Sequence, residues 1–293
     1  MRIPISVITG YLGSGKTTLL RRILSDSNRK LAVIMNEFGE VGIDGEIIKG
    51  KNVDMVELSG GCVCCSLTGE FEAAVKEVIE KAKPEHIVVE TTGVAEPDAI
   101  VVDIDENIKG VRLDSIITVA DADSMMKYPS IGYTGRVQLE MADIILVNKK
   151  DLVTEKQLEE VEEKIHELNP KAVKLRTVKC NADINLLFGI YSSKYVDMHE
   201  HSHIEDENMQ FFSVEAGRLD MEKFVSFVKS MPEDIYRAKG FAVFEDASYI
   251  FNYVAGRYDL EEFPAEKTKL VFIGKGVKSV EKEISEAVRK CVI

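Results

Sequence analysis

A glycine-rich turn between a strand and a helix is the feature of this sequence that most constrains its fold. Residues 10–17 read Gly-Tyr-Leu-Gly-Ser-Gly-Lys-Thr and match the pattern G-x-x-x-x-G-K-[ST]. An apolar run at residues 3–8 comes before the turn, and a helical pattern from Lys16 to Leu24 follows it. Glycines let backbone N–H groups curl around phosphate oxygens, and the following helix adds its positive dipole end. The sequence therefore predicts a phosphate-binding loop.

The positions of this loop have different expected roles. Lys16 can reach the terminal phosphates of a nucleotide, and the Thr17 hydroxyl can ligate Mg²⁺. The alternative, a glycine turn that happens to precede Lys-Thr, is disfavoured by the strand and helix on either side. The residues expected to contact the nucleotide are Gly10, Gly13, Ser14, Gly15, Lys16, Thr17 and Thr18.

The periodicity of the following sequence places the loop in a parallel α/β domain. Short β-branched runs, typical of buried strands, alternate with helical patterns. We expect strands at 3–8, 31–35, 53–58, 86–90, 115–120, 143–148 and 173–178, and helices at 16–24, 70–82 and 154–168. Alternation of this kind implies a mostly parallel sheet that is covered on both faces. Residues 1–195 are therefore predicted to form a P-loop NTPase domain.

A polar stretch separates this domain from a smaller one. Residues 196–208 are charged and lack an apolar period, which is typical of a linker. His199, His201 and His203 alternate within it and could hold a metal loosely if extended; a solvated linker is the better interpretation. Residues 209–293 predict an α+β domain, with strands at 211–215, 241–244, 249–254 and 269–273 and helices at 221–231 and 280–291.

The charge balance excludes some partners. The chain has 50 acidic and 37 basic residues, a net charge of −13. Such a surface repels phosphate backbones and anionic lipids, so nucleic acid and membranes are poor candidates. The short apolar run at the start favours a strand over a signal peptide, and no run reaches membrane-spanning length. We expect a cytoplasmic protein.

The segment Asn148-Lys149-Lys150-Asp151 indicates which base is bound. A carboxylate at Asp151 can accept two hydrogen bonds from guanine, through N1–H and the 2-amino group, whereas adenine would leave it unpaired. Asn148 can hold the surrounding loops, and the Lys149 stem can lie over the base. The alternative for Asp151 is an ordinary helix N-cap. Its place after a buried strand favours guanine.

Two further segments carry candidate catalytic carboxylates. Glu90 ends a buried strand and is placed to touch the Mg²⁺ shell or the attacking water, while Gly93 lets a backbone N–H approach the γ-phosphate. The alternative for Glu90 is a solvated strand end. Glu37 lies in an acidic, glycine-containing segment, residues 36–44, that could close on the nucleotide or a metal. An ordinary acidic turn is about as good an interpretation of that segment.

A cluster of cysteines indicates a metal site. Cys62, Cys64 and Cys65 are three of the five cysteines, too tightly clustered for a secreted disulfide framework. Thiolates favour Zn²⁺, Cu⁺ or Co²⁺, and three donors leave one tetrahedral position open for water, Glu37, a second chain or a client. A redox pair and plain buried cysteines are the alternatives. Cys180 and Cys291 are expected to be small buried hydrophobes.

These motifs together resemble those of the CobW-type metal-chaperone GTPases, relatives of the urease- and hydrogenase-maturation GTPases. The resemblance is carried by GYLGSGKTT, NEFGEVGID, GGCVCC, ETTGVAEP and NKKDL, in that order, and continues at residues 235–240 and 270–274. It implies slow Mg²⁺-dependent GTP hydrolysis, metal binding at the three clustered cysteines and delivery to a client metalloprotein. The linker has only three histidines, and Thr68 stands where many members have Arg.

The function expected from the sequence is therefore a GTP-dependent metallochaperone for Zn²⁺ or Co²⁺, with GTP or GDP, a client metalloprotein and a second copy of the chain as partners. No Gln or Arg is placed for catalysis, so hydrolysis should be slow until a partner, a dimer or a metal completes the site. Two alternatives are a metal sensor or store with little turnover and a small-molecule kinase with the same phosphate loop.

The guanine interpretation gives the first prediction. We expect the protein to bind GTP far more tightly than ATP and expect Asp151→Asn to shift its preference toward xanthosine nucleotides. An asparagine can donate a hydrogen bond to the 2-oxo group of xanthine, which the carboxylate cannot. Competition titrations with GTP, ATP and xanthosine triphosphate measure the preference. Equal affinity of the unmodified protein for ATP and GTP would rule the interpretation out.

Overall fold

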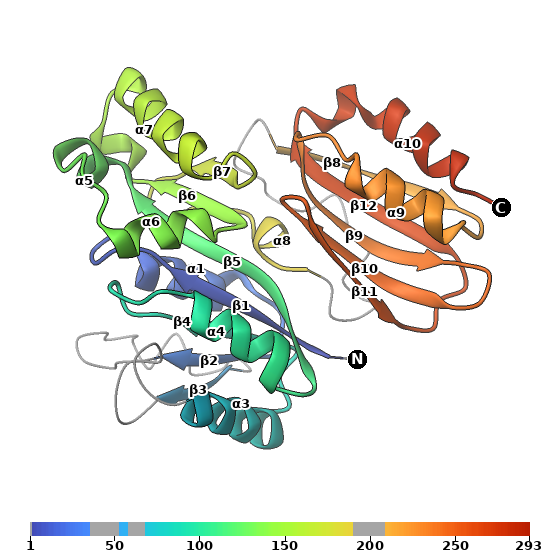
Figure 1. The fold of residues 1–293 in the computed structure, drawn as a ribbon, viewed down its shortest axis with the longest axis horizontal. Coiled ribbons are helices and arrows are strands. Elements are labelled where there is room, and N and C mark those ends of the chain that lie inside the picture. Colours follow the sequence, from blue (N-terminus) through green and yellow to red (C-terminus); the bar gives the residue numbers. More distant parts are fainter. Residues whose placement is uncertain (1, 36–52, 58–67, 190–208) are drawn as a thin grey trace. The chain divides into compact units, whose positions relative to one another are not determined.

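The computed structural model describes residues 2–35, 53–57, 68–189 and 209–293 (Figure 1). The chain forms two compact units, Arg2–Leu187 and Phe188–Ile293. The predicted domain border at residue 195 and the linker at 196–208, with its three histidines, lie outside the described residues.

A seven-stranded sheet forms the centre of the first unit. Its strands lie in the order β3-β2-β4-β1-β5-β6-β7. All of its described pairings are parallel, which confirms the predicted α/β class. The strands are β1 (Ile3–Thr9), β2 (Leu31–Met35), β3 (Val53–Glu57), β4 (His86–Glu90), β5 (Val111–Asp121), β6 (Ile144–Asn148) and β7 (Val173–Arg176).

Helices cover this sheet by burying apolar side chains that alternate along its strands. The helices are α1 (Lys16–Asp26), α3 (Thr68–Ala82), α4 (Asp98–Val102), α5 (Ala122–Lys127), α6 (Tyr133–Glu140), α7 (Glu155–Leu168) and α8 (Ile184–Leu187). Ile5 and Val7 of β1 pack in one cluster with residues of α3 and α4. Ile145 and Val147 of β6 pack in another with α5, α6 and α7. Parallel strands with packed helices place every strand's carboxyl end at one edge, where ligands bind in such folds.

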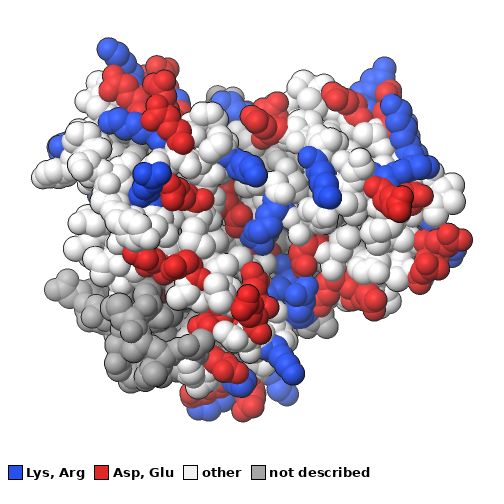
Figure 2. Space-filling view, viewed as in Figure 1, with Lys and Arg blue, Asp and Glu red and all other residues white. Residues whose placement is uncertain are grey.

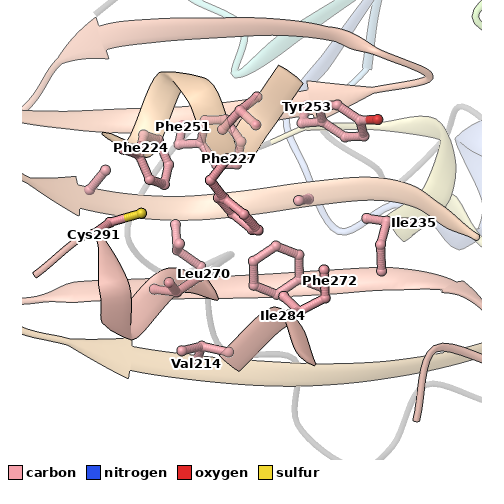
Figure 3. Packing of buried hydrophobic residues seen from close by; sticks show 14 of the residues in the cluster. Val214, Phe224, Phe227, Ile235, Phe251, Tyr253, Leu270, Phe272, Ile284 and Cys291 are labelled. Carbon is pink, nitrogen blue, oxygen red and sulfur yellow. The ribbon is translucent and has the colours of Figure 1, made fainter. Parts of the chain in front are cut away.

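The second unit is an α+β domain, as predicted. Its antiparallel sheet has the order β11-β10-β9-β12-β8. Phe212 stacks on Phe272 at 5.1 Å, and Phe224 meets Phe251 edge-on at 5.2 Å, in a core that Figure 3 shows from close by. Cys291 lies in this core, which confirms it as a buried hydrophobe. The elements are β8 (Met209–Ala216), α9 (Met221–Lys229), β9 (Ile235–Val243), β10 (Ser248–Val254), β11 (Arg257–Glu262), β12 (Thr268–Lys275) and α10 (Glu281–Lys290).

Buried charged residues explain where the sequence-based strand limits were wrong. β5 begins at Val111 instead of residue 115. The additional residues 111–114 include the buried ion pair Arg112–Asp114, at 3.2 Å. β9 begins at Ile235 instead of residue 241, and Arg237 and Lys239 within it are also buried. Because strands are predicted from runs of apolar residues, a buried charged residue interrupts the run and the predicted strand is too short. The sequence does not predict strand β11, because its partly exposed residues are mostly charged and form no apolar run.

Acidic and basic side chains are intermixed on the face of the molecule seen in Figure 2. Several pair along one helix at the i,i+4 spacing, among them Glu72–Lys76 and Glu77–Lys81 of α3. Exposed pairs of this kind add little to stability because water and salt screen them, so packing stabilises the fold. None of the helices in the described parts of the chain is both long enough and apolar enough to cross a membrane.

Close packing of β9 against β12 gives a stability prediction. A Cβ atom at Gly240 would overlap the Lys269 carbonyl oxygen and lie 2.7 Å from Leu270 Cα. We expect Gly240→Ala to lower the free energy of unfolding of the second unit by at least ~2 kcal/mol, because backbone atoms of a paired strand would have to shift. Hydrogen–deuterium exchange of β9 and β12 amides measures the loss.

Gly217→Ala is the matched control, because its Cβ atom would meet only Val292 Cγ1, at 3.6 Å. It should change stability by no more than about 0.5 kcal/mol. Equal effects of the two substitutions would contradict the close approach of β9 and β12.

Candidate functional site

The phosphate loop after β1 has a backbone that only glycine adopts easily. Gly10, Gly13 and Gly15 have φ angles of 131°, 74° and 118°. A Cβ atom at Gly10 would overlap the Val119 carbonyl oxygen of β5, and one at Gly15 would lie 2.7 Å from Asn148 Nδ2. The loop therefore lies directly against β5 and β6. Gly10 and Gly15 are needed both for φ and for space, and Gly13 for φ alone.

Lys16 brings a buried cation to this loop. Its side chain is 8% exposed, and Nζ donates hydrogen bonds to the carbonyl oxygens of Gly10 at 2.7 Å and Tyr11 at 3.3 Å. Burial lowers the pKa of the Lys16 ammonium, and the nearby Glu90 carboxylate offsets part of that shift. The ammonium is thus held at the base of the loop by neutral acceptors and one carboxylate.

Glu90 and Thr17 lie together at the carboxyl end of β4. The Thr17 hydroxyl donates to Glu90 Oε1 at 3.4 Å. Burial raises the pKa of the Glu90 carboxyl, and Lys16 and Thr17 lower it by less. Three buried oxygens at this edge lack a hydrogen-bond partner among the described residues: Glu90 Oε2, Ser14 Oγ and Thr92 Oγ1. Buried oxygens without partners are costly, so these are the atoms here that could take a ligand or a cation.

Gly93 lies against the phosphate loop. A Cβ atom at Gly93 would lie 2.6 Å from the Leu12 backbone nitrogen. The segment before it is fixed to β1, because the Thr91 backbone N–H donates to Ile8 O at 2.9 Å and the Thr91 hydroxyl donates to Thr9 at 3.0 Å. The loops after β1 and β4 therefore form one packed unit.

Asn148 joins the phosphate loop to the loop after β7. Its Nδ2 donates to Ser14 O at 2.9 Å, and its Oδ1 accepts from the Cys180 backbone N–H at 2.9 Å and the Thr177 hydroxyl at 3.1 Å. The prediction that Cys180 is buried is confirmed, and burial raises the pKa of its thiol to about 12. A neutral, unreactive thiol fits a packing role.

Lys149 is held by a carboxylate that sequence reasoning missed. Lys149 has a left-handed backbone with φ of 61°, and its Nζ donates to Asp121 Oδ2 at 2.7 Å. Burial alone would raise the pKa of Asp121, but the bonds from Lys149 and Ser124 together lower it. Only the register of β5 with β6, which sets Asp121 beside Asn148, reveals this contact.

Asp151 lies in a short 3₁₀ turn, Lys150–Leu152, and is exposed. The following helix α7 is capped by Thr154, whose hydroxyl and Gln157 form a capping box. The alternative interpretation of Asp151 as the N-cap of that helix is therefore wrong. An exposed carboxylate beside Lys149 is free of the capping role and accessible to a ligand.

A second missed residue, Arg22 of α1, supports the loop after β7. Its Nε donates to Lys179 O at 2.7 Å and its Nη1 to Asn181 Oδ1 at 2.9 Å. Lys179 and Cys180 both have positive φ, 51° and 54°, which costs energy in residues other than glycine. Arg22 and Asn148 both hydrogen-bond to this strained turn, and these bonds stabilise its backbone conformation.

The remaining predicted site residues lie outside the described part of the chain. These are Glu37, Cys62, Cys64 and Cys65. Within the described ranges, no group of three metal-ligating side chains occurs. The chain leaves β2 at Met35 and β3 at Glu57, and both strands run parallel to β4. It therefore enters the segments with Glu37 and the cysteines from the same edge of the sheet that carries the phosphate loop.

Comparison with known proteins places both units. Residues 4–176 match the CobW/HypB/UreG nucleotide-binding domain, and residues 210–292 match the cobalamin synthesis protein cobW C-terminal domain. The chain is 28% identical over 291 residues to zinc chaperone CobW from Sinorhizobium, with 82% of this chain and 81% of that protein aligned. It is 34% identical over 224 residues to zinc-regulated GTPase metalloprotein activator 1 of Saccharomyces cerevisiae, with 65% of this chain aligned but only 52% of that protein.

A solved structure shows a similar fold. The crystal structure of Zn(II)-bound YjiA GTPase from E. coli has a TM-score of 0.50 and 24% sequence identity, covering 98% of each chain. Both units of the present chain thus have counterparts in one known fold.

The desolvated carboxyl of Glu90 gives a prediction on stability. We expect Glu90→Gln to raise the free energy of unfolding of the nucleotide-free protein near neutral pH. The folded state raises this pKa, so ionised Glu90 is destabilising above the ordinary value of 4.5 and neutral in both states below it. Urea unfolding followed across this pH range should show the gain fade as the pH falls.

Glu159→Gln, at an exposed position of α7, is the control and should leave the free energy of unfolding nearly unchanged at every pH. A loss of stability in Glu90→Gln at neutral pH would show that the Lys16 and Thr17 contacts outweigh burial.

Proposed function

The chain belongs to the CobW/HypB/UreG nucleotide-binding family, and from this premise we propose that it is a GTP-dependent metallochaperone. Its cargo would be a thiophilic metal ion, Zn²⁺ first and Co²⁺ second, delivered to a client metalloprotein. The observation that carries the proposal is that the cysteine-containing segment starts from the sheet edge that holds the phosphate loop. Relatives named zinc chaperones, similar in sequence across both units, support it.

The described residues fit a nucleotide with its Mg²⁺ ion. The phosphates would lie on the backbone of Gly10, Gly13, Ser14 and Gly15, at the start of α1 with Lys16 and Thr18. Thr17 and Glu90 would hold Mg²⁺, and the unpartnered Glu90 Oε2 gives the carboxylate a free donor atom for it. Bound Mg²⁺ would neutralise phosphate charge. Without Mg²⁺ the buried charge of Glu90 would destabilise the folded protein, whereas with Mg²⁺ the same charge would bind the ion.

Base selection would rest on the loop after β6. Asp151 would accept both guanine hydrogen bonds, and the Lys149 stem would cover the base while its ammonium stays with Asp121. Asn148 would keep the base loop and the phosphate loop in register through Ser14 O. This arrangement supports GTP over ATP, and with it a GTPase over a small-molecule kinase.

Hydrolysis would be slow without help. Neither the phosphate loop nor residues 90–95 contain an arginine or a glutamine that could stabilise the transferring phosphoryl group or orient water. We assign Lys16 to charge stabilisation and Glu90 to Mg²⁺ or the attacking water. Glu37, a client, a second copy of the chain or the cargo metal would complete the site.

The cargo would bind to the thiolates of Cys62, Cys64 and Cys65, with one position left for Glu37, water or a client ligand. GTP would order these segments into a geometry that holds metal, and hydrolysis would release it. Thiolate ligands need a reducing compartment, so we propose the cytoplasm. The C-terminal unit would contact the client or a second copy, while nucleic acid and membranes are not proposed as partners.

This proposal predicts coupling between nucleotide and metal. We expect a non-hydrolysable GTP analogue with Mg²⁺ to raise the affinity for Zn²⁺, whereas GDP does not, by the ordinary coupling of about 1–3 kcal/mol. Cys64→Ala and Cys65→Ala should abolish the coupling and leave metal-free GTP binding nearly intact. Affinity for Zn²⁺ should rise with pH around neutrality, because binding releases thiol protons. Titration against a competing chelator in the three nucleotide states measures this.

Cys291→Ala is the matched control, because this cysteine is buried in the core of the second unit and should not affect coupling. Identical Zn²⁺ affinity of the nucleotide-free, GDP and GTP-analogue states would leave a GTPase that merely carries a cysteine cluster. Binding of Zn²⁺ without any GTP turnover would instead favour a sensor or store.

A further inference from the structure

Gln138 of α6 is a buried amide that none of the sequence motifs contains. It is 1% exposed, and its Nε2 donates hydrogen bonds to Ala95 O at 2.8 Å and Gly93 O at 3.3 Å. Both acceptors belong to the loop that follows β4 and Glu90. A buried amide is placed only where its donors are used, because an unsatisfied one costs free energy. Gln138 therefore fixes the orientation of two peptide groups in this loop.

Gln138 is itself tied to the strand next to β1. The Thr118 hydroxyl of β5 donates to Gln138 O at 2.7 Å. Thr118 pairs in register with Thr9, the residue that precedes the phosphate loop, and Thr9 accepts the hydroxyl of Thr91. The loop after β4 is thus anchored at Thr91 on one side and through Gln138 on the other.

Gly93 lies between these anchors and touches the phosphate loop. The absence of a side chain lets its backbone approach that of Leu12, where a Cβ atom would come within 2.6 Å of the nitrogen. The next residues turn back, because the Ala95 N–H donates to Thr92 O at 3.1 Å. The two bonds from Gln138 add to these contacts by holding the carbonyl oxygens of Gly93 and Ala95 in place.

We infer that Gln138 is a positioning residue that holds the Gly93 backbone in reach of the γ-phosphate and so makes the protein prefer GTP over GDP. The inference rests on the proposed function, since the two nucleotides differ only in that phosphate. A ligand shifts a conformation only by binding one state better than another. A loop held in place before binding spends less of the binding free energy on ordering, so loss of Gln138 should weaken GTP selectively.

Two substitutions test this. Gln138→Met keeps the volume and removes both donors, and Gln138→Glu keeps the shape and sets a carboxylate against two carbonyl oxygens. Each should lower affinity for a non-hydrolysable GTP analogue with Mg²⁺ by about five- to tenfold and change affinity for GDP by less than about twofold. In Gln138→Glu the preference should partly return as the pH falls, because a protonated carboxyl donates one hydrogen bond. The unmodified protein, titrated at each pH, supplies the reference.

Asn169→Leu is the matched control. Asn169 is another buried amide, and its Nδ2 donates to the carbonyl oxygens of Leu139, Glu140 and Ala142 at the end of the same helix. It should destabilise the first unit, measured by thermal unfolding, without changing the ratio of the two nucleotide affinities. If Asn169→Leu lowered the ratio as Gln138→Met does, Gln138 would have a structural role only.

The outcomes separate this inference from the proposed function. An unmodified protein that does not bind the GTP analogue with Mg²⁺ overturns the proposed function. An unmodified protein that prefers the analogue, together with folded Gln138→Met and Gln138→Glu variants that keep the same preference, overturns the role of Gln138 alone.

Discussion

The seating of the phosphate loop on the ends of β5 and β6 is the constraint on which the rest of the site depends. The Gly10 backbone is pressed against Val119, and the Asn148 amide holds Ser14 O. These contacts need parallel strands in fixed register, because both supports come from strand ends. The register of the strands therefore determines the conformation of the phosphate loop. The same edge receives Glu90 from β4 and Lys149 from the end of β6.

Charge is used at this edge at a cost to stability. Lys16 and Glu90 are both shielded from water, and burial moves the pKa of each toward its neutral form. The opposite charge of each limits the pKa shift of the other. Lys149 and Asp121 form an ion pair at 2.7 Å. At the phosphate end of the site, burial thus disfavours the charged forms of Lys16 and Glu90. At the base end, the Lys149 ammonium is neutralised by the Asp121 carboxylate.

The sequence predicted the parallel sheet, the phosphate loop, the strand-end carboxylate and the second α+β unit, because each has a local signature in period or motif. It did not predict Asp121, Arg22 or Gln138, because each bonds to residues distant in sequence. It also shortened β5 and β9, because Arg112 and Arg237 are buried where a pattern search expects apolar residues. Local sequence patterns predict helices, strands and loops. The residues that position those loops can be identified only once the register of the strands is known.

A mechanism that couples this edge to a metal site requires linkage in both directions. The most direct measurement is calorimetric titration of the unmodified protein with a non-hydrolysable GTP analogue and with GDP, each with Mg²⁺ and each in the presence and absence of Zn²⁺. The account predicts that Zn²⁺ raises affinity for the GTP analogue by about five- to 150-fold and leaves affinity for GDP unchanged. Affinities that Zn²⁺ leaves unaltered for both nucleotides would contradict it.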